Sequence, residues 1–169
     1  MKVLRWEGCD NGLPKDTFNN LSEGKKQKIF LSAVKEFSTR RFSEASINQI
    51  VKVAGISRGS FYQYFNDKED LFLYMLAEIS KEKRNVILSG EAIDRDADFL
   101  EAYMKAMKNS LQWGKTKPEY ARISMMMEID DSAFITGLRK NMTKGLIELI
   151  ERDKKRSMPP KFFHGKYCL

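Results

Sequence analysis

Apolar residues recur three and four positions apart through most of the chain, which is the spacing of amphipathic helices. The stripes predict helices over 22–37, 46–54, 58–65 and 71–88, then from the aspartates at 94–98 to near 113, over 118–127 and over 134–150. Residues 1–21 lack such a stripe and are expected to form a loose arm. The predicted fold class is therefore all-α.

Three short helices separated by tight turns are predicted within SINQIVKVAGISRGSFYQYFNDKED, residues 46–70. Ser46 with Gln49 matches a capping box at the start of the first. Gly55 stands where a left-handed residue often ends a helix, and Ser57 can cap the next one. This pattern predicts a helix-turn-helix.

The predicted helix Arg58–Phe65 has two chemically different faces. Phe61 and Phe65 lie four residues apart and are expected in the core, whereas the outward face holds the following four residues: Arg58, Gly59, Tyr62 and Gln63. Glu and Lys would be more usual on a purely solvated helix face. Arg and Gln match the edges of guanine and adenine, and tyrosine can reach phosphate or thymine methyl groups. The pattern favours insertion into a DNA groove.

The third helix is expected to begin at a cap, either Asn66 or Asp67. Lys68 then stands beside free backbone N–H groups, where it could hold a phosphate. A purely structural interpretation stays open for several of these side chains, because the serines are caps in either case and charged groups can simply be solvated.

The distribution of charge agrees with a DNA-binding front end. The chain carries a net charge of +7; residues 1–68 hold 12 basic and 7 acidic side chains, whereas residues 69–151 hold 12 and 15. A polyanion would therefore be attracted mainly to one end of the molecule.

Other functional classes find little support in the residues. Cys9, Cys168 and His164 form no metal-ligand spacing or disulfide framework, and no Gly-rich phosphate loop is present, so we expect neither an enzyme nor a bound metal or cofactor. No apolar run is long enough to cross a membrane, which predicts a cytoplasmic protein without a membrane partner.

Residues 22–72, and AGISRGSFYQYFNDKEDLF above all, resemble the N-terminal DNA-binding region of the TetR family of bacterial transcriptional regulators. The resemblance implies a three-helix helix-turn-helix domain over 22–68, joined by a linker helix to a helical ligand-binding and dimerisation domain over 69–156. It also implies double-stranded DNA as the partner. The implied DNA contacts are Ser46, Ser57, Arg58, Gly59, Ser60, Tyr62, Gln63, Tyr64 and Lys68.

Family members often enclose a small apolar or amphipathic ligand in the second domain. The residues that the resemblance suggests for such a pocket are Phe99, Tyr103, Met107, Trp113, Tyr120, Met126 and Phe134. Ordinary core packing is the alternative for each of them, since methionine and aromatic stripes are common in cores.

The two ends of the chain depart from the family pattern. Pro159 and Pro160 stop the last helix, so residues 157–169 are expected to be an irregular basic tail in place of the two long helices that usually form a dimer interface. Residues 1–12 are expected to be an upstream extension.

The sequence thus predicts a ligand-responsive repressor that binds a palindromic operator as a homodimer through Arg58–Phe65. A shortened member that binds DNA weakly without ligand response, or a helical protein-interaction module, are the alternatives.

Overall fold

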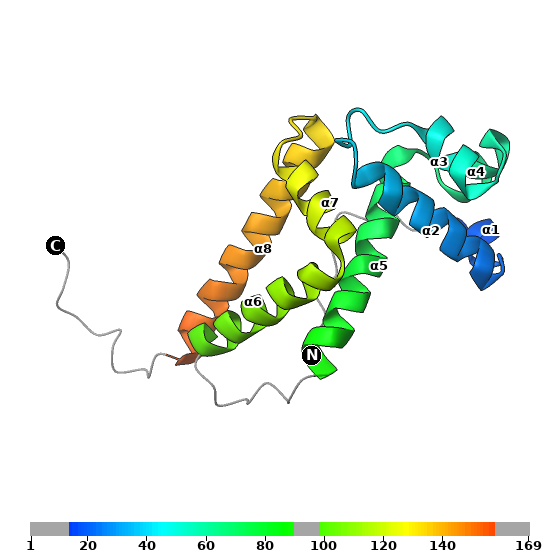
Figure 1. Ribbon diagram of the computed structural model, residues 1–169. Coiled ribbons are helices and arrows are strands. Elements are labelled where there is room, and N and C mark those ends of the chain that lie inside the picture. The colour runs from blue at the N-terminus through cyan, green and yellow to red at the C-terminus, as the bar shows by residue number, and fades with distance from the viewer. Residues whose placement is uncertain (1–13, 90–98, 158–169) are drawn as a thin grey trace. The chain divides into compact units, whose positions relative to one another are not determined.

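The computed structural model describes residues 14–89 and 99–157, and every regular element within these ranges is an α-helix (Figure 1). The all-α prediction is confirmed. The chain forms two compact units, one ending at Ser132 and one beginning at Ala133. The helices are α1 (Asp16–Asn19), α2 (Glu23–Phe37), α3 (Ile47–Ala54), α4 (Arg58–Tyr64), α5 (Lys68–Ser89), α6 (Phe99–Thr116), α7 (Pro118–Glu128) and α8 (Ala133–Ser157).

The turn between α3 and α4 has the predicted geometry. Gly55 adopts the left-handed conformation, with φ 68° and ψ 35°, which glycine reaches without Cβ strain. Ser57 then accepts a hydrogen bond from the backbone N–H of Ser60 at 3.0 Å and caps α4. Gly55 thus ends α3 and Ser57 caps α4, as the sequence predicts.

The predicted capping box at Ser46 is wrong. Ser46 occupies the N-cap position of α3, but its side chain makes no capping bond. Its backbone N–H instead donates to Oε1 of Glu36 at 2.9 Å. Glu36 is only 6 % exposed and lies at the end of α2, so the start of α3 is held by a neighbouring helix rather than by its own first turn. Ser22, at the N-cap position of α2, likewise makes no side-chain capping bond.

Aromatic side chains form the core that holds α2 to α5 together. Phe61 and Phe65 are both fully buried, as the sequence predicts. The rings of Phe37 and Phe72 meet edge to face with centroids 4.8 Å apart, and those of Phe42 and Phe72 with centroids 5.2 Å apart. The outward face of α4 is therefore presented by a well-packed scaffold.

The expected loose arm over residues 1–21 is wrong for the part of it that the structure describes. Residues 16–19 form α1, and Phe18 is 1 % exposed. Its ring packs against Phe65, Tyr64 and Tyr74, with centroid distances of 5.0, 6.0 and 4.9 Å. One buried aromatic residue thus fixes a segment too short for a detectable helical stripe. Residues 1–13, with the expected upstream extension, lie outside the described residues.

The later helices of the first unit start where the sequence places them. Asp67 caps α5 by accepting from the backbone N–H of Asp70 at 2.9 Å, and Pro118 opens α7. Helix α6 continues through Gly114 to Thr116, slightly beyond its predicted end. The helix predicted over 71–88 is α5, which runs to Ser89.

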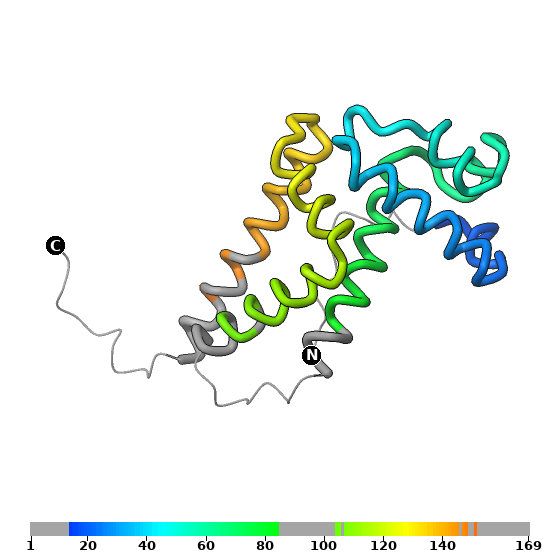
Figure 2. Tube along the Cα trace, in the orientation of Figure 1, coloured from blue at the N-terminus to red at the C-terminus, as the bar shows by residue number. Residues whose placement is uncertain are grey.

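The buried carboxylate of Asp130 joins the segment after α7 to the connection between α2 and α3. These two parts of the chain lie side by side in Figure 2. Asp130 is fully buried, and one of its oxygens accepts from the backbone N–H of Ser43 at 2.7 Å and from the Ser43 hydroxyl at 2.9 Å. The other oxygen accepts from the backbone N–H of Ser132 at 2.9 Å.

The second unit contains α8, which continues seven residues beyond the predicted stripe, to Ser157. The first residue of the expected irregular tail is thus helical, and residues 158–169 lie outside the described residues. Across the described parts of the chain, none of the helices is both long and apolar enough to span a membrane.

Candidate nucleic-acid interface

Helix α4 divides into a buried and an exposed face, as its sequence predicts. Phe61 is fully buried, whereas Arg58, Gly59 and Gln63 are exposed and Tyr62 is 39 % exposed. A Cβ built on Gly59 would meet only the Ser57 hydroxyl, at 3.8 Å, so nothing in the protein itself requires a glycine there. The structure therefore brings the four predicted base-reading residues onto one accessible surface.

Arg58 is held in place by a residue that sequence reasoning missed. Its Nη1 donates to Oδ1 of Asn48 at 2.7 Å, and its Nη2 lies 3.4 Å from the hydroxyl of Tyr62. The guanidinium carbon is 5.8 Å from the centre of the Tyr62 ring. Asn48 lies on the exposed side of α3, and only the crossing of α3 and α4 brings it beside Arg58. It joins the candidate interface because an asparagine amide can also pair with adenine.

The serines at the start of α4 act first as structural caps. Ser57 and Ser60 share a hydrogen bond of 2.8 Å between their hydroxyls, in addition to the capping bond from the Ser60 N–H. Both still lie beside the first turn of the helix, where backbone N–H groups attract anions. Their predicted phosphate contacts, and that of Ser46, stay predictions.

Tyr64 does not fit the predicted contact with the DNA backbone. It is 6 % exposed and its ring meets that of Phe18 edge to face. The flank on which the sequence placed Tyr64 is open on an isolated α4, but α1 covers it in the folded chain. The structure assigns this side chain to the core.

Lys68 also has a different role from the predicted phosphate clamp. Its ammonium donates to the carbonyl oxygens of Phe42 at 2.6 Å, Ala45 at 3.0 Å and Ser43 at 3.5 Å, and lies 4.6 Å from the centre of the Phe42 ring. Burial lowers the pKa of Lys68. All three ammonium protons are thus directed to the α2–α3 connection, which Lys68 ties to the start of α5.

We expect Lys68→Met to lower the free energy of unfolding by about 2 kcal/mol, because it removes an ammonium that donates to three backbone carbonyls while keeping the apolar stem. Urea unfolding followed by circular dichroism would measure this. The matched control is Lys52→Met on α3, an exposed lysine for which little change is expected. If Lys68→Met were as stable as the wild type but bound DNA with a salt slope reduced by about one, Lys68 would be a phosphate contact, as the sequence predicts.

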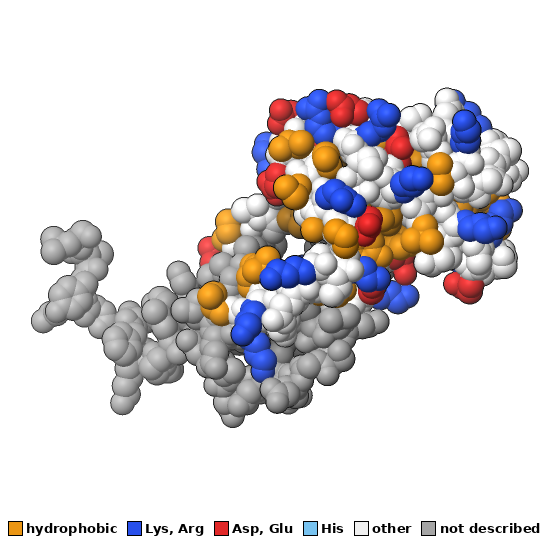
Figure 3. All heavy atoms as spheres, in the orientation of Figure 1, with side chains coloured by type: hydrophobic (Ala, Val, Ile, Leu, Met, Phe, Trp, Pro, Cys, Tyr) orange, Lys and Arg blue, Asp and Glu red, His pale blue; other side chains and the backbone are white. Residues whose placement is uncertain are grey.

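Basic side chains also occur on the surface next to α4. Figure 3 shows Lys and Arg side chains set among uncharged ones over the part of the surface formed by α1 to α4. Lys26 pairs with Glu23 at 2.8 Å, and the Lys25 ammonium is 5.9 Å from the centre of the Tyr64 ring. Such partly exposed pairs are weak, so these lysines are free to attract phosphates over a distance.

Comparison with known proteins identifies the family that the helix-turn-helix region matches. The model for "Bacterial regulatory proteins, tetR family" matches residues 29–75, a range that contains α3, α4 and the first turns of α5. A TetR family transcriptional regulator from Chloroflexus aurantiacus, solved by crystallography, is 29 % identical in sequence; the match has a TM-score of 0.60 and covers 83 % of this chain and 66 % of the other. Residues 29–75 thus form a TetR-type DNA-binding region, and the chain as a whole is similar in fold to a TetR family transcriptional regulator.

Similar transcriptional regulators come from several bacteria. The HTH-type transcriptional regulator YdgC of Bacillus subtilis is 23 % identical over 144 residues, which cover 83 % of this chain and 69 % of YdgC. AcrR of Shigella flexneri is 43 % identical over 47 residues, 28 % of this chain and 22 % of AcrR. The structure of NalD, the secondary repressor of the MexAB-OprM multidrug efflux pump in Pseudomonas aeruginosa, matches with a TM-score of 0.56 and 24 % identity over 82 % of this chain and 74 % of NalD, which shows a shared fold. The match to the Chloroflexus structure spans less than two thirds of that TetR protein.

The residues predicted to line the TetR-type ligand pocket are not gathered around a described cavity. The side chains of Phe99 and Tyr103 lie outside the described residues. Met107 is 41 % exposed, and Met126 and Phe134 are half-buried. Their predicted role in ligand binding stays a prediction.

Tyr120 and Trp113, the other two predicted pocket residues, pack on each other with ring centroids 5.4 Å apart. Tyr120 is 9 % exposed, and its hydroxyl donates to Glu82 at 3.2 Å. Burial, with the Glu82 carboxylate nearby, raises the pKa of Tyr120 to about 12. The buried Trp113 Nε1 has no hydrogen-bond partner among the described residues.

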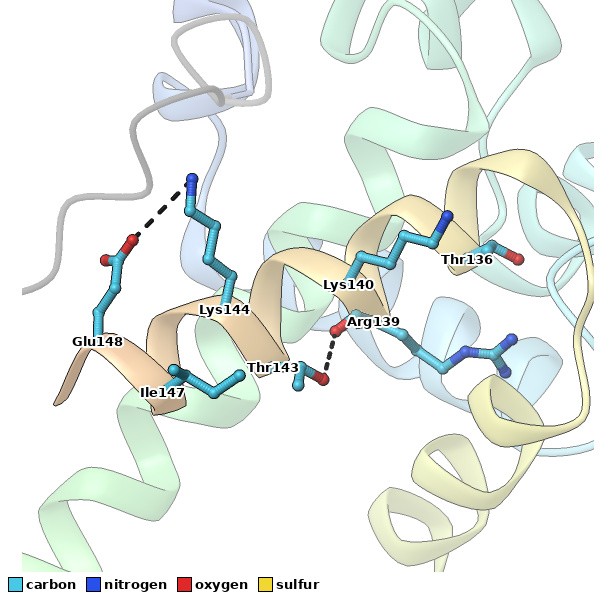
Figure 4. Close-up of a pocket in the computed structure, with 7 residues that line it drawn as sticks. All are labelled: Thr136, Arg139, Lys140, Thr143, Lys144, Ile147 and Glu148. Atoms are coloured by element: carbon cyan, nitrogen blue, oxygen red, sulfur yellow. Dashed lines mark hydrogen bonds and ion pairs between the residues drawn. The ribbon is translucent and has the colours of Figure 1, made fainter. Parts of the chain in front are cut away.

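A hollow on the surface of α8 contains none of the predicted pocket residues. Its lining residues all come from this one helix (Figure 4): Thr136, Arg139, Lys140, Thr143, Lys144, Ile147 and Glu148. They include a Lys144–Glu148 ion pair at 4.0 Å. A surface supplied by a single helix offers little enclosure for a small molecule.

Proposed function

We propose that this TetR-family chain is a ligand-responsive repressor, which binds a palindromic operator as a homodimer and reads bases in the major groove with α4. The observation that carries the proposal is the exposed face of α4, where Arg58, Gly59, Tyr62 and Gln63 lie together on a packed aromatic scaffold. The guanidinium of Arg58 and the amide of Gln63 can pair with base edges, and the absence of a side chain at Gly59 lets the backbone approach a phosphate.

A homodimer would place two copies of α4 about 34–36 Å apart, or a multiple of this distance, on successive major-groove faces. Dimerisation also needs apolar surface to bury. On α6, Met104, Met107 and Leu111 lie three and four residues apart and are 60, 41 and 64 % exposed. On α8, Met142 and Ile147 are each 50 % exposed. These exposed apolar side chains support the proposed dimer. If the chain were instead a protein-interaction module, the same residues would contact its partner.

Ligand response requires a physical connection between the later helices and the DNA-binding helices. The hydrogen bonds between Asp130 and Ser43 supply one, since they join the end of α7 to the connection that leads into α3. The unpaired Trp113 Nε1 supports a ligand with a hydrogen-bond acceptor. Such a ligand would change DNA affinity only by binding one conformation better than the other.

The proposal is tested by selecting duplexes from a random-sequence DNA library with the full chain. We expect enrichment of an inverted repeat bound by two chains. Arg58→Ala should weaken binding to the enriched duplex by about 1–3 kcal/mol and relax the base preference at one position in each half-site. Fluorescence anisotropy on duplexes that vary at single positions would measure both effects.

The matched control is Arg122→Ala on α7, which removes the same charge from an arginine that is 51 % exposed and pairs with Glu119 at 3.5 Å. We expect it to leave base preference unchanged. Failure of the wild-type chain to enrich any sequence at low salt, or equal losses of preference in the two variants, would contradict the proposal.

A further inference from the structure

The segment 15–18 closes the C-terminal end of α4 with groups from outside the helix. The last four carbonyls of any α-helix lack partners within it. In α4 the carbonyl of Phe61 accepts from the backbone N–H of Phe65 at 2.9 Å. The remaining three carbonyls, those of residues 62 to 64, are all taken by two residues of the N-terminal segment, Lys15 and Thr17.

Each of these three bonds uses a different kind of donor. The Lys15 ammonium donates to the carbonyl of Tyr62 at 2.9 Å, and the Lys15 backbone N–H donates to the carbonyl of Tyr64 at 2.9 Å. The Thr17 hydroxyl donates to the carbonyl of Gln63. The Lys15 charge also lies at the negative end of the α4 dipole, where a cation is favourable.

Helix α4 depends on such support because of its length. It has seven residues, and helices this short are unstable unless other parts of the protein hold them. Two of the three carbonyls held from outside belong to Tyr62 and Gln63, which carry side chains of the exposed face. A shift at this end would therefore move the groups proposed to enter the groove.

We propose that Lys15 and Thr17 are positioning residues for DNA recognition: they hold the C-terminal end of α4, and through it Tyr62 and Gln63, in the orientation that binds DNA. Neither side chain needs to touch the nucleic acid. The inference rests on the proposed function for its effect on DNA binding, whereas its effect on α4 itself can be measured without DNA.

The first test is hydrogen–deuterium exchange on the free full-length chain. Thr17→Val keeps the shape of the side chain and removes the donor, and Lys15→Met removes the ammonium and keeps the stem. Both variants should exchange the amides of residues 58–65 faster than the wild type, while α2 stays protected. Thr143→Val, which removes a hydroxyl that bonds within α8 at 3.1 Å, is the matched control.

The second test measures affinity for the duplex that the wild-type chain enriches from a random library. Loss of one net hydrogen bond predicts three- to ten-fold weaker binding for Thr17→Val, with an unchanged salt slope because no charge is altered. Lys15→Met should bind more weakly by a similar factor, also with an unchanged slope. A Lys140→Met variant on α8 controls for the loss of one positive charge.

The results separate this inference from the proposed function. Suppose that both variants exchange faster in α4 but the wild-type chain enriches no duplex. This result would show that Lys15 and Thr17 stabilise α4, and it would refute the proposed operator binding. Unchanged exchange in both variants would overturn the inference whatever the DNA results. It would also be overturned if Thr17→Val bound the enriched duplex normally while Lys15→Met lost one charge from the salt slope, since Lys15 would then be a direct phosphate contact.

Discussion

Replacing Phe18 with alanine is expected to lower the free energy of unfolding by about 3 kcal/mol. The side chain is 1 % exposed, and its ring packs against the rings of Tyr64, Phe65 and Tyr74. Truncation of a buried phenylalanine to alanine removes transfer free energy and leaves a cavity, at a typical cost of about 3–5 kcal/mol. We expect a value at the lower end of this range because α1 lies at the edge of the unit. The segment can detach there, which limits the loss of stability.

Urea unfolding followed by circular dichroism measures this change, with Leu31→Ala as the control. Leu31 is 51 % exposed on α2, so its truncation should cost less than about 0.5 kcal/mol. Limited trypsin digestion gives an independent measurement, because undocking exposes the bond after Lys15. A Phe18→Ala protein with wild-type stability and wild-type cleavage at Lys15 would show that the segment contributes nothing to the fold.

The packing of Phe18 also explains which parts of the fold the sequence could predict. Stripes of apolar residues predicted the helices α2 to α5, and local turn chemistry predicted the roles of Gly55 and Ser57, because periodicity and turn chemistry are properties of neighbouring residues. A four-residue helix has no measurable period. Its position depends on one ring reaching the core, which follows from tertiary packing and not from a pattern along the chain.

The same distinction applies to the candidate site. Arg58, Gly59, Tyr62 and Gln63 could be placed on one face from the helical repeat alone. The contacts of Tyr64 and Lys68 within the protein could not be predicted, because their partners, Phe18 and the carbonyls around Phe42, lie 46 and 26 residues away in the sequence. The link between Arg58 and Asn48 was missed for the same reason, since it requires the crossing of two helices.

Long-range partners outweigh local ones elsewhere in the first unit as well. At Ser46 a local capping box was available, yet the backbone N–H bonds to Glu36 on another helix. At Ser43 the partner is Asp130, 87 residues away. The connection between α2 and α3 is thus held from three sides, by Glu36, Lys68 and Asp130. Side chains from α2, from α5 and from the segment after α7 thus help to fix where α3, and then α4, begin.

Asp130 gives the second large effect, and its sign depends on pH. Burial alone would raise its pKa, but the hydrogen bonds from Ser132 and Ser43 outweigh burial and lower the pKa to about 2 from the ordinary value of 3.8. A carboxylate with a lowered pKa in the folded state stabilises the fold above its unfolded pKa. That contribution is lost as the pH falls from about 4 towards 2, and the shift corresponds to about 2 kcal/mol at neutral pH.

Asp130→Asn should therefore lower the free energy of unfolding by about 2 kcal/mol at pH 7. The amide has one acceptor oxygen where the carboxylate uses two, and its NH₂ group would face an N–H or O–H donor of Ser43 or Ser132. Urea unfolding at pH 7, 5, 4 and 3 should show the gap between wild type and variant narrowing below pH 4. Asp16→Asn, a change at an exposed carboxylate on α1, should leave a small and nearly constant gap. A gap at Asp130 that stayed constant down to pH 3 would mean that its charge contributes nothing, and that only the shape of the side chain holds Ser43 in place.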